Sequence, residues 1–280
     1  MGQIKLRKML KDSLYHKYEQ GHGKAKTDKV HNGTEAIHSH NTYKTYMREV
    51  EHFSAWAKNE GIKDYDKAAA SVPKYLDQMR FEGKSAWTVS TALCALAKAF
   101  NKSTTDFNYE LPKRHREDIT RSREHVERDK HFSAEKNQAL IRFAESTGLR
   151  RRELEELKGS DMIIIGDRVL IHVQNGKGGK ERLVEAVGHK QHVINLCKRA
   201  GSGKVFPTVH NGADIHYYRA NYAKAIYNKY ARNLGMLERH EKYYCRGDMK
   251  GQVFDRKAMK IASENLGHNR IDVIANNYMY

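Results

Sequence analysis

The sequence predicts a mainly α-helical protein with one small antiparallel β-sheet, an α+β chain divided into two domains. Apolar residues recur at helical spacing over most of the chain, whereas strand-like patterns are confined to residues 162–187. The chain has 280 residues, more than a typical single domain. Between two periodic regions, residues 102–130 lose all apolar periodicity, which indicates a connection between domains.

The first 35 residues are expected to form a basic N-terminal arm, residues 1–35. They hold one short amphipathic pattern, from Ile4 to about Tyr18, and then a lysine- and glycine-bearing run from Gly21 to Gly33. A stretch of this composition offers little apolar surface to bury. We therefore expect the first compact domain to begin after it.

Residues 36–112 predict a small all-helical domain. One helix is expected from Asn41 up to Gly61, because apolar residues recur there at helical spacing and a glycine ends the run. A second begins near Pro73, and Ser85 is expected to be the N-cap of a third.

Residues 113–130 are expected to link this domain to a second one, residues 131–280. Charges of both signs accumulate in the linker, which opens with the basic cluster Lys113-Arg114-His115-Arg116. In the second domain Ser133 is expected to cap a helix that ends at Gly148, where glycine suits a left-handed conformation. Arg150 is then expected to open the next helix.

A small antiparallel sheet interrupts these helices. Two strands, Met162–Ile165 and Arg168–Val173, are predicted on either side of a Gly-Asp turn, and a third, Glu181–Val187, follows a glycine-rich turn. The remainder is expected to be helical. The expected helices cover residues 193–199, a segment capped by Asp214, residues 256–265 and residues 271–278.

The strong positive charge limits the classes of partner. Lys and Arg number 51 against 34 Asp and Glu, a formal net charge of +17, which favours nucleic acid or an acidic membrane face. No apolar run approaches the roughly 18 residues of a membrane span, and no signal-peptide pattern stands at the N-terminus, so we expect a cytoplasmic protein. Three dispersed cysteines argue against a zinc site or a disulfide framework.

Arg150 and Arg219 are candidate phosphate ligands. A guanidinium presents paired donors in one plane, matches two phosphate oxygens and stays charged at any working pH. His216 lies three positions before Arg219 on an expected helix, so both side chains project from one face. Taken singly, an arginine in so basic a chain is more simply a helix-end residue, and His216 a solvent-exposed histidine.

Lys177 stands in the glycine-rich turn between two expected strands. A long cationic side chain there can reach a leaving oxygen and donate a proton to it; Lys180 is its competitor. The turn is not a Walker loop, because Glu181 stands where Ser or Thr is required. The simpler interpretation of an exposed lysine in such a turn is that it aids solubility.

Tyr278 shares an apolar helical face with Ile271 and Ile274, where a tyrosine ordinarily belongs to the core. A phenol, whose pKa is roughly 10, needs nearby arginine and histidine to act as a nucleophile at neutral pH. His268 precedes Tyr278 by ten positions and could supply that assistance. Tyr280 is the alternative nucleophile.

Taken in order, these residues resemble the motifs of the tyrosine recombinase (phage integrase) family over roughly residues 36–280. The matching motifs are Thr147-Gly148-Leu149-Arg150, the glycine-framed Lys177, His216-x-x-Arg219, Leu266-Gly267-His268 and Tyr278. The resemblance implies that Arg150, Lys177, His216, Arg219, His268 and Tyr278 are catalytic, and that Glu153 supports the site. It also implies a core-binding domain that clamps DNA, followed by a catalytic domain. Lys113, Arg114, Arg116 and Lys180 are expected DNA contacts.

Two departures from the family pattern stand out. Ala220 follows Arg219, where the family commonly has a histidine. Arg219 and His268 are 49 positions apart, about twice the spacing of compact members, which implies an insertion around residues 235–251.

The resemblance implies a site-specific DNA recombinase or integrase of a mobile genetic element, an enzyme that breaks and rejoins strands through a 3′-phosphotyrosyl intermediate. It implies no cofactor, neither metal nor ATP. The implied partners are double-stranded DNA and accessory proteins that bend DNA or set direction, and the implied assembly is a homotetramer on two DNA sites. The resemblance also implies a nucleoid-associated location and no membrane partner. A DNA-relaxing enzyme of the type IB topoisomerase kind and a catalytically inactive DNA-binding relative stay open as alternatives.

Overall fold

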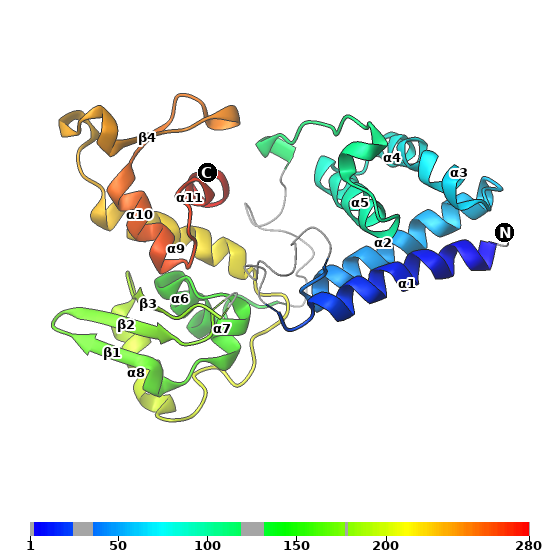
Figure 1. Cartoon of the computed structure of the whole chain (residues 1–280). Helices are drawn as coiled ribbons and strands as arrows, with labels where there is room; N and C mark the ends of the chain where they lie inside the picture. The colour runs from blue at the N-terminus through cyan, green and yellow to red at the C-terminus, as the bar shows by residue number, and fades with distance from the viewer. Residues whose placement is uncertain (1–2, 25–35, 119–131, 177–178, 280) are drawn as a thin grey trace. The chain divides into compact units, whose positions relative to one another are not determined.

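The structure is a computed structural model that describes residues 3–24, 36–118, 132–176 and 179–279. The chain divides into two compact units, Met1–Asp118 and Ile119–Tyr280. Figure 1 shows that the first is helical and that the second combines helices with short antiparallel strands. The predicted fold class is therefore confirmed. None of the helices in the described ranges is long and apolar enough to cross a membrane.

Within the described residues, the first unit consists of helices joined by short turns. They are α1 (Gln3–Gly21), α2 (His40–Asn59), α3 (Tyr65–Ala70), α4 (Val72–Phe81) and α5 (Ala86–Ala99), followed by the 3₁₀ helices η1 (Thr104–Phe107) and η2 (Arg116–Asp118). The Ser85 hydroxyl caps α5 by accepting a hydrogen bond from the Thr88 amide at 3.3 Å. Pro73 lies in the first turn of α4, as expected.

Residues 3–21 do not form the basic arm expected over residues 1–35. They form α1, which packs along α2 and also contacts α5. The helix buries three leucines that repeat every four positions, Leu6, Leu10 and Leu14. Because residues four apart share one face of a helix, this short stripe is sufficient to dock α1. Arg7 adds an ion pair with Glu51 of α2. Residues 25–35 lie outside the described ranges.

The core of the first unit is built around aromatic rings. Phe53 of α2 lies 5.3 Å from Tyr75 and 5.7 Å from Phe100 between ring centroids, both in edge-on geometry. Edge-on pairs of this kind stabilise a core beyond the area that they bury. Phe107 of η1 is buried against the same cluster, so the first unit extends beyond its last long helix.

The second unit is built from short helices and two small sheets. In chain order the elements are α6 (Gln138–Thr147), α7 (Arg151–Glu156), η4 (Gly159–Asp161), β1 (Met162–Ile165), β2 (Arg168–Val173), β3 (Arg182–Glu185), α8 (Lys190–Ala200), α9 (Ile215–Tyr230), η5 (Leu234–Met236), η6 (Arg239–Glu241), β4 (Lys242–Tyr244), η7 (Gly247–Met249), β5 (Val253–Asp255), α10 (Arg256–Asn265) and α11 (Asp272–Tyr278). The first two strands have the bounds that the sequence predicts, and the third is shorter than expected.

Three strands form an antiparallel sheet in the order β1-β2-β3. Ile171 of β2 pairs with Met162 on one side and with Val184 on the other. Ile171 and Val184 are fully buried in the core that this sheet shares with the helices of the unit. The packed face of the sheet therefore fixes the position of β3, whose first residue enters the site described below.

Local capping rules hold at α9 but not at α6. Asp214 caps α9 by accepting from the Tyr217 amide at 3.1 Å, as expected. The expectation that Ser133 caps α6 is wrong, because the helix begins only at Gln138. The Ser133 hydroxyl instead accepts from the Lys136 amide at 3.3 Å, which closes a turn before the helix.

The sequence predicts helix after α9, but this segment forms the hairpin β4–β5, which follows η5 and η6 and contains η7 between its two strands. It occupies the place of the implied insertion. Arg232, just after α9, donates to both carboxylate oxygens of Asp255 at 2.8 Å. Asp255 in turn caps α10 through the Lys257 amide at 2.9 Å. The hairpin thus ties the end of α9 to the beginning of α10, which leads into Leu266-Gly267-His268.

Candidate active site

The corner between α6 and α7 brings Arg150 to the site. Gly148 ends α6 in the left-handed region at φ 57°, as expected, and Arg150 precedes the first residue of α7. A Cβ atom at Gly148 would lie 2.3 Å from the ring of Tyr222. Only glycine therefore allows the corner to approach α9 this closely.

Arg219 reaches the same corner from the middle of α9. Its side chain is only 1% exposed, and its guanidinium donates to the Gly148 carbonyl and, at 3.2 Å, to the Leu266 carbonyl. Burial lowers the pKa of Arg219 from its ordinary value, and the neighbouring Arg150 acts in the same direction, whereas Tyr278 opposes both. The site therefore holds a buried positive charge against backbone carbonyl oxygens.

Arg150 shares one of these acceptors. Its Nη2 lies 3.0 Å from the Leu266 carbonyl oxygen and 3.4 Å from that of Gly267, while Nη1 donates to Glu153 Oε1 at 2.9 Å. The two guanidinium groups thus converge on the end of α10 from different helices. Two converging cations of this geometry can bind the non-bridging oxygens of a phosphodiester.

Glu153 is the anionic partner in this cluster. Its carboxylate accepts from the Arg150 amide at 2.8 Å, and Arg182 of β3 donates to both of its oxygens, at 2.9 and 2.8 Å. Burial opposes ionisation of the carboxyl, but the hydrogen bonds and charges of Arg182 and Arg150 outweigh it and lower the pKa of Glu153 to about 2. Glu153 is therefore ionised throughout the neutral range.

His268 and Tyr278 form a pair beside Arg219. His268 Nε2 lies 3.1 Å from the Tyr278 hydroxyl, and the tautomer of the ring decides which atom donates. The centre of the Tyr278 ring is 6.0 Å from Arg219 Cζ, and the side chain is 7% exposed. A neutral imidazole in this position can accept the phenolic proton.

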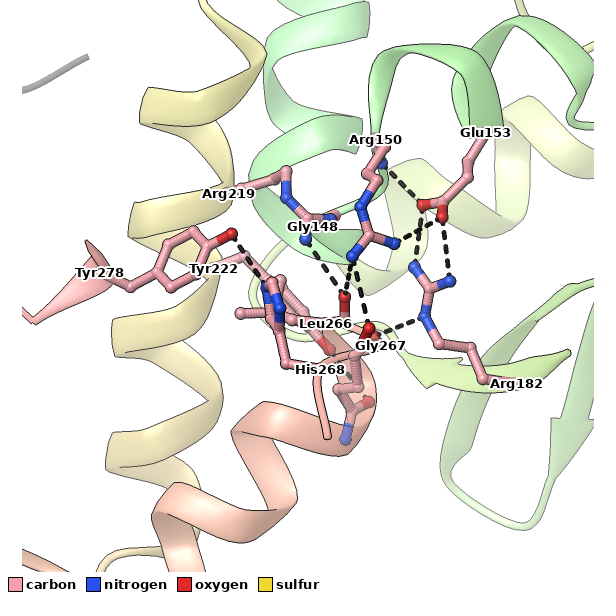
Figure 2. Close-up of polar contacts among 11 residues, drawn as sticks. Gly148, Arg150, Glu153, Arg182, Arg219, Tyr222, Leu266, Gly267, His268 and Tyr278 are labelled. Atoms are coloured by element: carbon pink, nitrogen blue, oxygen red, sulfur yellow. Dashed lines mark hydrogen bonds and ion pairs between the residues drawn. The ribbon is translucent and has the colours of Figure 1, made fainter. Parts of the chain in front are cut away.

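Figure 2 shows how far the expected set comes together. The structure gathers Arg150, Glu153, Arg219, His268 and Tyr278 in one cluster of hydrogen bonds and ring contacts, although they span residues 150–278. His216 lies in the first turn of α9 with an exposed side chain. Lys177 and Tyr280 lie outside the described residues.

Arg182 belongs to this cluster and was missed in the sequence analysis. Its guanidinium donates to Glu153, and its Nε donates to the Asn265 carbonyl at 2.9 Å. The side chain is 9% exposed. One signal was available: Arg182 stands two positions before Val184 in the predicted strand, and a charged residue on the same strand face as an apolar one indicates a partner.

Of the other expected DNA contacts, Lys180 belongs to the second unit and the rest belong to the first. Lys180 is exposed and donates to Asn269 Oδ1 at 2.6 Å, next to His268 in the sequence. Lys113 and Arg114 are exposed in the first unit, where the Arg114 guanidinium lies 5.7 Å from the centre of the Trp87 ring. Arg116 begins η2, and its side chain is not among those described.

Curated relatives of the chain are tyrosine recombinases. Tyrosine recombinase XerC of Bacillus licheniformis is 27% identical over 173 residues, 56% of this chain and 56% of the relative. A tyrosine recombinase of Caldanaerobacter subterraneus subsp. tengcongensis is 28% identical over 186 residues, 59% of this chain and 62% of the relative. Over this part of its length the chain is similar to tyrosine recombinases. The resemblance to this family that the ordered motifs indicate is thus confirmed, and no family model matches the chain.

Solved structures of the tyrosine recombinase fold agree with the architecture. The Tn1549 transposon integrase in complex with circular intermediate DNA has a TM-score of 0.53 at 12% identity, with coverage of 98% of this chain and 95% of that chain. XerH site-specific recombinase bound to difH substrate has a TM-score of 0.51 at 15% identity, with 97% and 91% covered. At these identities the likeness establishes the fold. The chain spans about three fifths of the length of the curated relatives that it matches.

Proposed function

We propose that this protein is a tyrosine-type site-specific DNA recombinase or integrase that breaks and rejoins strands through a covalent tyrosyl-DNA intermediate. One observation carries the proposal. The Tyr278 hydroxyl lies 3.1 Å from His268 Nε2, beside the buried Arg219, and Arg150 and Arg219 share the Leu266 carbonyl. A phenol, a base and two guanidinium groups in one cluster are what attack on a phosphodiester requires.

In the first step the Tyr278 oxygen attacks the scissile phosphorus and the bond from phosphorus to the 5′-oxygen breaks. His268 accepts the phenolic proton, and the departing 5′-oxygen takes a proton, for which Lys177 is the proposed donor. The product is a 3′-phosphotyrosyl ester and a free 5′-hydroxyl. Attack by a 5′-hydroxyl of another strand on this ester reverses the chemistry, so the bond energy is conserved and the cycle balances without ATP.

The two arginines are proposed to stabilise the negative charge that develops on the non-bridging oxygens. Besides the Glu153 carboxylate that Arg150 contacts, their present acceptors are backbone carbonyls, which a phosphate can replace as a stronger acceptor. The Arg150 side chain is 22% exposed and Arg219 is 1% exposed. We infer that the phosphate meets Arg150 first and reaches Arg219 only as Tyr278 turns toward the phosphorus.

Binding of double-stranded DNA by both units completes the proposal. The first unit is proposed to be the core-binding domain and residues 131–280 the catalytic domain. The net charge of +17 supports DNA binding dominated by phosphate contacts. The proposed DNA contacts are Lys113, Arg114, Arg116 and Lys180. His216 is proposed to take part in catalysis. A homotetramer on two DNA sites, accessory proteins that bend DNA or set direction, and a nucleoid-associated location follow from the same proposal.

A suicide substrate tests the proposed chemistry. Duplexes from the sequences that flank the gene, each carrying a nick beside a candidate cleavage position, lose a short fragment after cleavage and trap the covalent complex. We expect trapping by the unmodified chain and by Tyr280→Phe, and none by Tyr278→Phe. If Tyr280→Phe alone abolished trapping, Tyr278 would not be the nucleophile.

The same proteins separate the alternatives. Relaxation of supercoiled plasmids that lack any trapping sequence would indicate a topoisomerase. Tight, salt-sensitive DNA binding without trapping on any of the duplexes would indicate an inactive relative.

A further inference from the structure

Arg182 holds three segments of the second unit together. It opens β3, it donates to both carboxylate oxygens of Glu153 at the beginning of α7, and its Nε donates to the Asn265 carbonyl at the end of α10. A planar guanidinium can bind in this way because its donors point in fixed directions. Lysine, with a single nitrogen, cannot make all three contacts.

Two glycines leave the space that this guanidinium occupies. A Cβ atom at Gly267 would lie 3.1 Å from Arg182 Nε, and one at Gly176 would lie 2.8 Å from Arg182 Nη1. Gly267 is also in the left-handed region at φ 68°. The glycine of Leu266-Gly267-His268 and the glycine before Lys177 therefore both pack on Arg182.

The way Glu153 is shared determines how Arg150 is held. Arg182 occupies both carboxylate oxygens, so the Arg150 side chain makes one contact with Glu153, through Nη1 at 2.9 Å. Its Nη2 is left to point at the Leu266 carbonyl, the side on which Arg219 and Tyr278 lie. Without Arg182, the Glu153 carboxylate could accept a bidentate pair of hydrogen bonds from the Arg150 guanidinium, which is the preferred geometry of arginine–carboxylate pairs.

We propose that Arg182 is a positioning residue: it competes with Arg150 for Glu153 and so keeps Arg150 Nη2 directed at the phosphate site. The proposal rests on the proposed function, because its catalytic consequence requires that Arg150 binds the scissile phosphate. Arg182 itself touches no reacting atom. It acts through Glu153 on one side and through the backbone of Asn265–Gly267 on the other.

The first test needs no DNA. In the arginine side-chain NMR spectrum of the full chain, the Nε–H signal of Arg150 is assigned with Arg150→Lys. We expect Arg182→Gln to shift this signal and slow its hydrogen exchange, because Arg150 closes onto Glu153. The matched control is Arg168→Gln, which removes another arginine of the same sheet from a buried carboxylate, Glu185, at 3.2 Å. The proposal is overturned if the Arg150 signal does not shift in Arg182→Gln, or if it shifts equally in Arg168→Gln.

The second test measures single-turnover cleavage of the suicide duplex. We expect Arg182→Gln to slow covalent trapping by about 100-fold, the scale of losing one aimed donor, with unchanged DNA affinity. On a duplex whose scissile phosphate is an uncharged methylphosphonate the defect should shrink by about tenfold, because less charge needs to be stabilised. Glu153→Gln combined with Arg182→Gln should recover part of the rate, since a neutral amide holds Arg150 less tightly.

The outcomes separate this proposal from the proposed function. An equal defect on both substrates, or no recovery in the double variant, would show that Arg182 acts only through general stability, which melting curves of all variants measure in parallel. If the unmodified chain traps no DNA while Arg182→Gln still shifts the Arg150 signal, the positioning contact holds and the recombinase function fails.

Discussion

Two regions of the second unit deliver an arginine to the same carbonyl oxygen, and they do so in opposite ways. The corner between α6 and α7 presents Arg150, 22% exposed and paired with the ionised Glu153. The middle of α9 presents Arg219, 1% exposed and bonded to the carbonyls of Gly148 and Leu266. The first cation is held by an opposite charge, and the second by burial among backbone dipoles.

This difference indicates that the two arginines have different roles. A partly exposed arginine with a carboxylate partner can meet an incoming phosphate and be steered by its neighbours. A buried arginine acts in a low-dielectric environment, where its charge has the strongest effect on a developing anion. The pKa of Arg219 is lowered by burial, which means that the fold retains this charge at a free-energy cost. A group kept at such a cost is a functional candidate.

The largest expected effect is on cleavage. Because both guanidinium groups are proposed to bind the same phosphate, Arg219→Gln and Arg150→Gln should each slow covalent trapping by about 1000-fold. Single-turnover assays on the suicide duplex measure the two rates, with Arg168→Gln as a control that keeps a normal rate. If either variant retained a normal rate, the phosphate would be held by only one of the two regions.

The second effect is a pH dependence of the free energy of unfolding, and only the Arg150 region should contribute to it. The pKa of Glu153 is about 2 in the folded chain against an ordinary value of 4.5. Its ion pairs therefore stabilise the fold fully above pH 4.5, and this contribution is lost as the pH falls from 4.5 toward 2. This contribution to the free energy of unfolding is about 3 kcal/mol, since each pKa unit corresponds to about 1.36 kcal/mol.

Urea unfolding at pH 6 and at pH 3 measures this contribution. The unmodified chain should lose more stability between these two values than Glu153→Gln, which has no carboxyl to titrate at this position. Equal losses in both proteins would mean that the carboxylate is not stabilised in the fold.

The third effect concerns the corner that joins the two regions. Gly148→Ala places a methyl group 2.3 Å from the Tyr222 ring at a residue with φ 57°, so both overpacking and backbone strain apply. We expect a loss of about 3 kcal/mol in the free energy of unfolding. Gly166→Ala is the matched control, since Gly166 has φ 59° with no atom near the added group, and should cost about 1 kcal/mol. Equal costs would show that the corner can move away from α9.

Much of this site could be predicted from the sequence because its members stand at ends of elements. Gly148, Asp214 and Gly267 mark helix ends by their chemistry, and the motifs attached to them carry Arg150, Arg219 and His268. Local rules of capping and left-handed glycine therefore place three of the site residues. Their convergence depends on tertiary packing, and the ordered motifs made it predictable through the family resemblance.

The elements that escaped prediction lack a periodic signal or compete with a local alternative. The strands β4 and β5 have three residues each, too few for an alternating pattern. The leucine stripe of α1 is embedded in lysines, so the segment resembles an unfolded basic arm until α2 and α5 cover it. Arg182 shares a strand face with the buried Val184, but no local pattern identifies Glu153, 29 positions earlier, as its partner.

The smallest expected effect separates the two regions by stability instead of activity. Arg150→Met leaves the buried Glu153 with one fewer charged donor, and we expect a loss of about 2 kcal/mol in the free energy of unfolding. Arg219→Met removes hydrogen bonds from two carbonyls but also removes a buried charge. These contributions oppose one another, and the net change should stay within about 1 kcal/mol. Urea unfolding at pH 7 measures both. A larger loss for Arg219→Met than for Arg150→Met would mean that the bonds to Gly148 and Leu266 outweigh the cost of burying the charge, and α9 would then hold its arginine for the fold rather than for the phosphate.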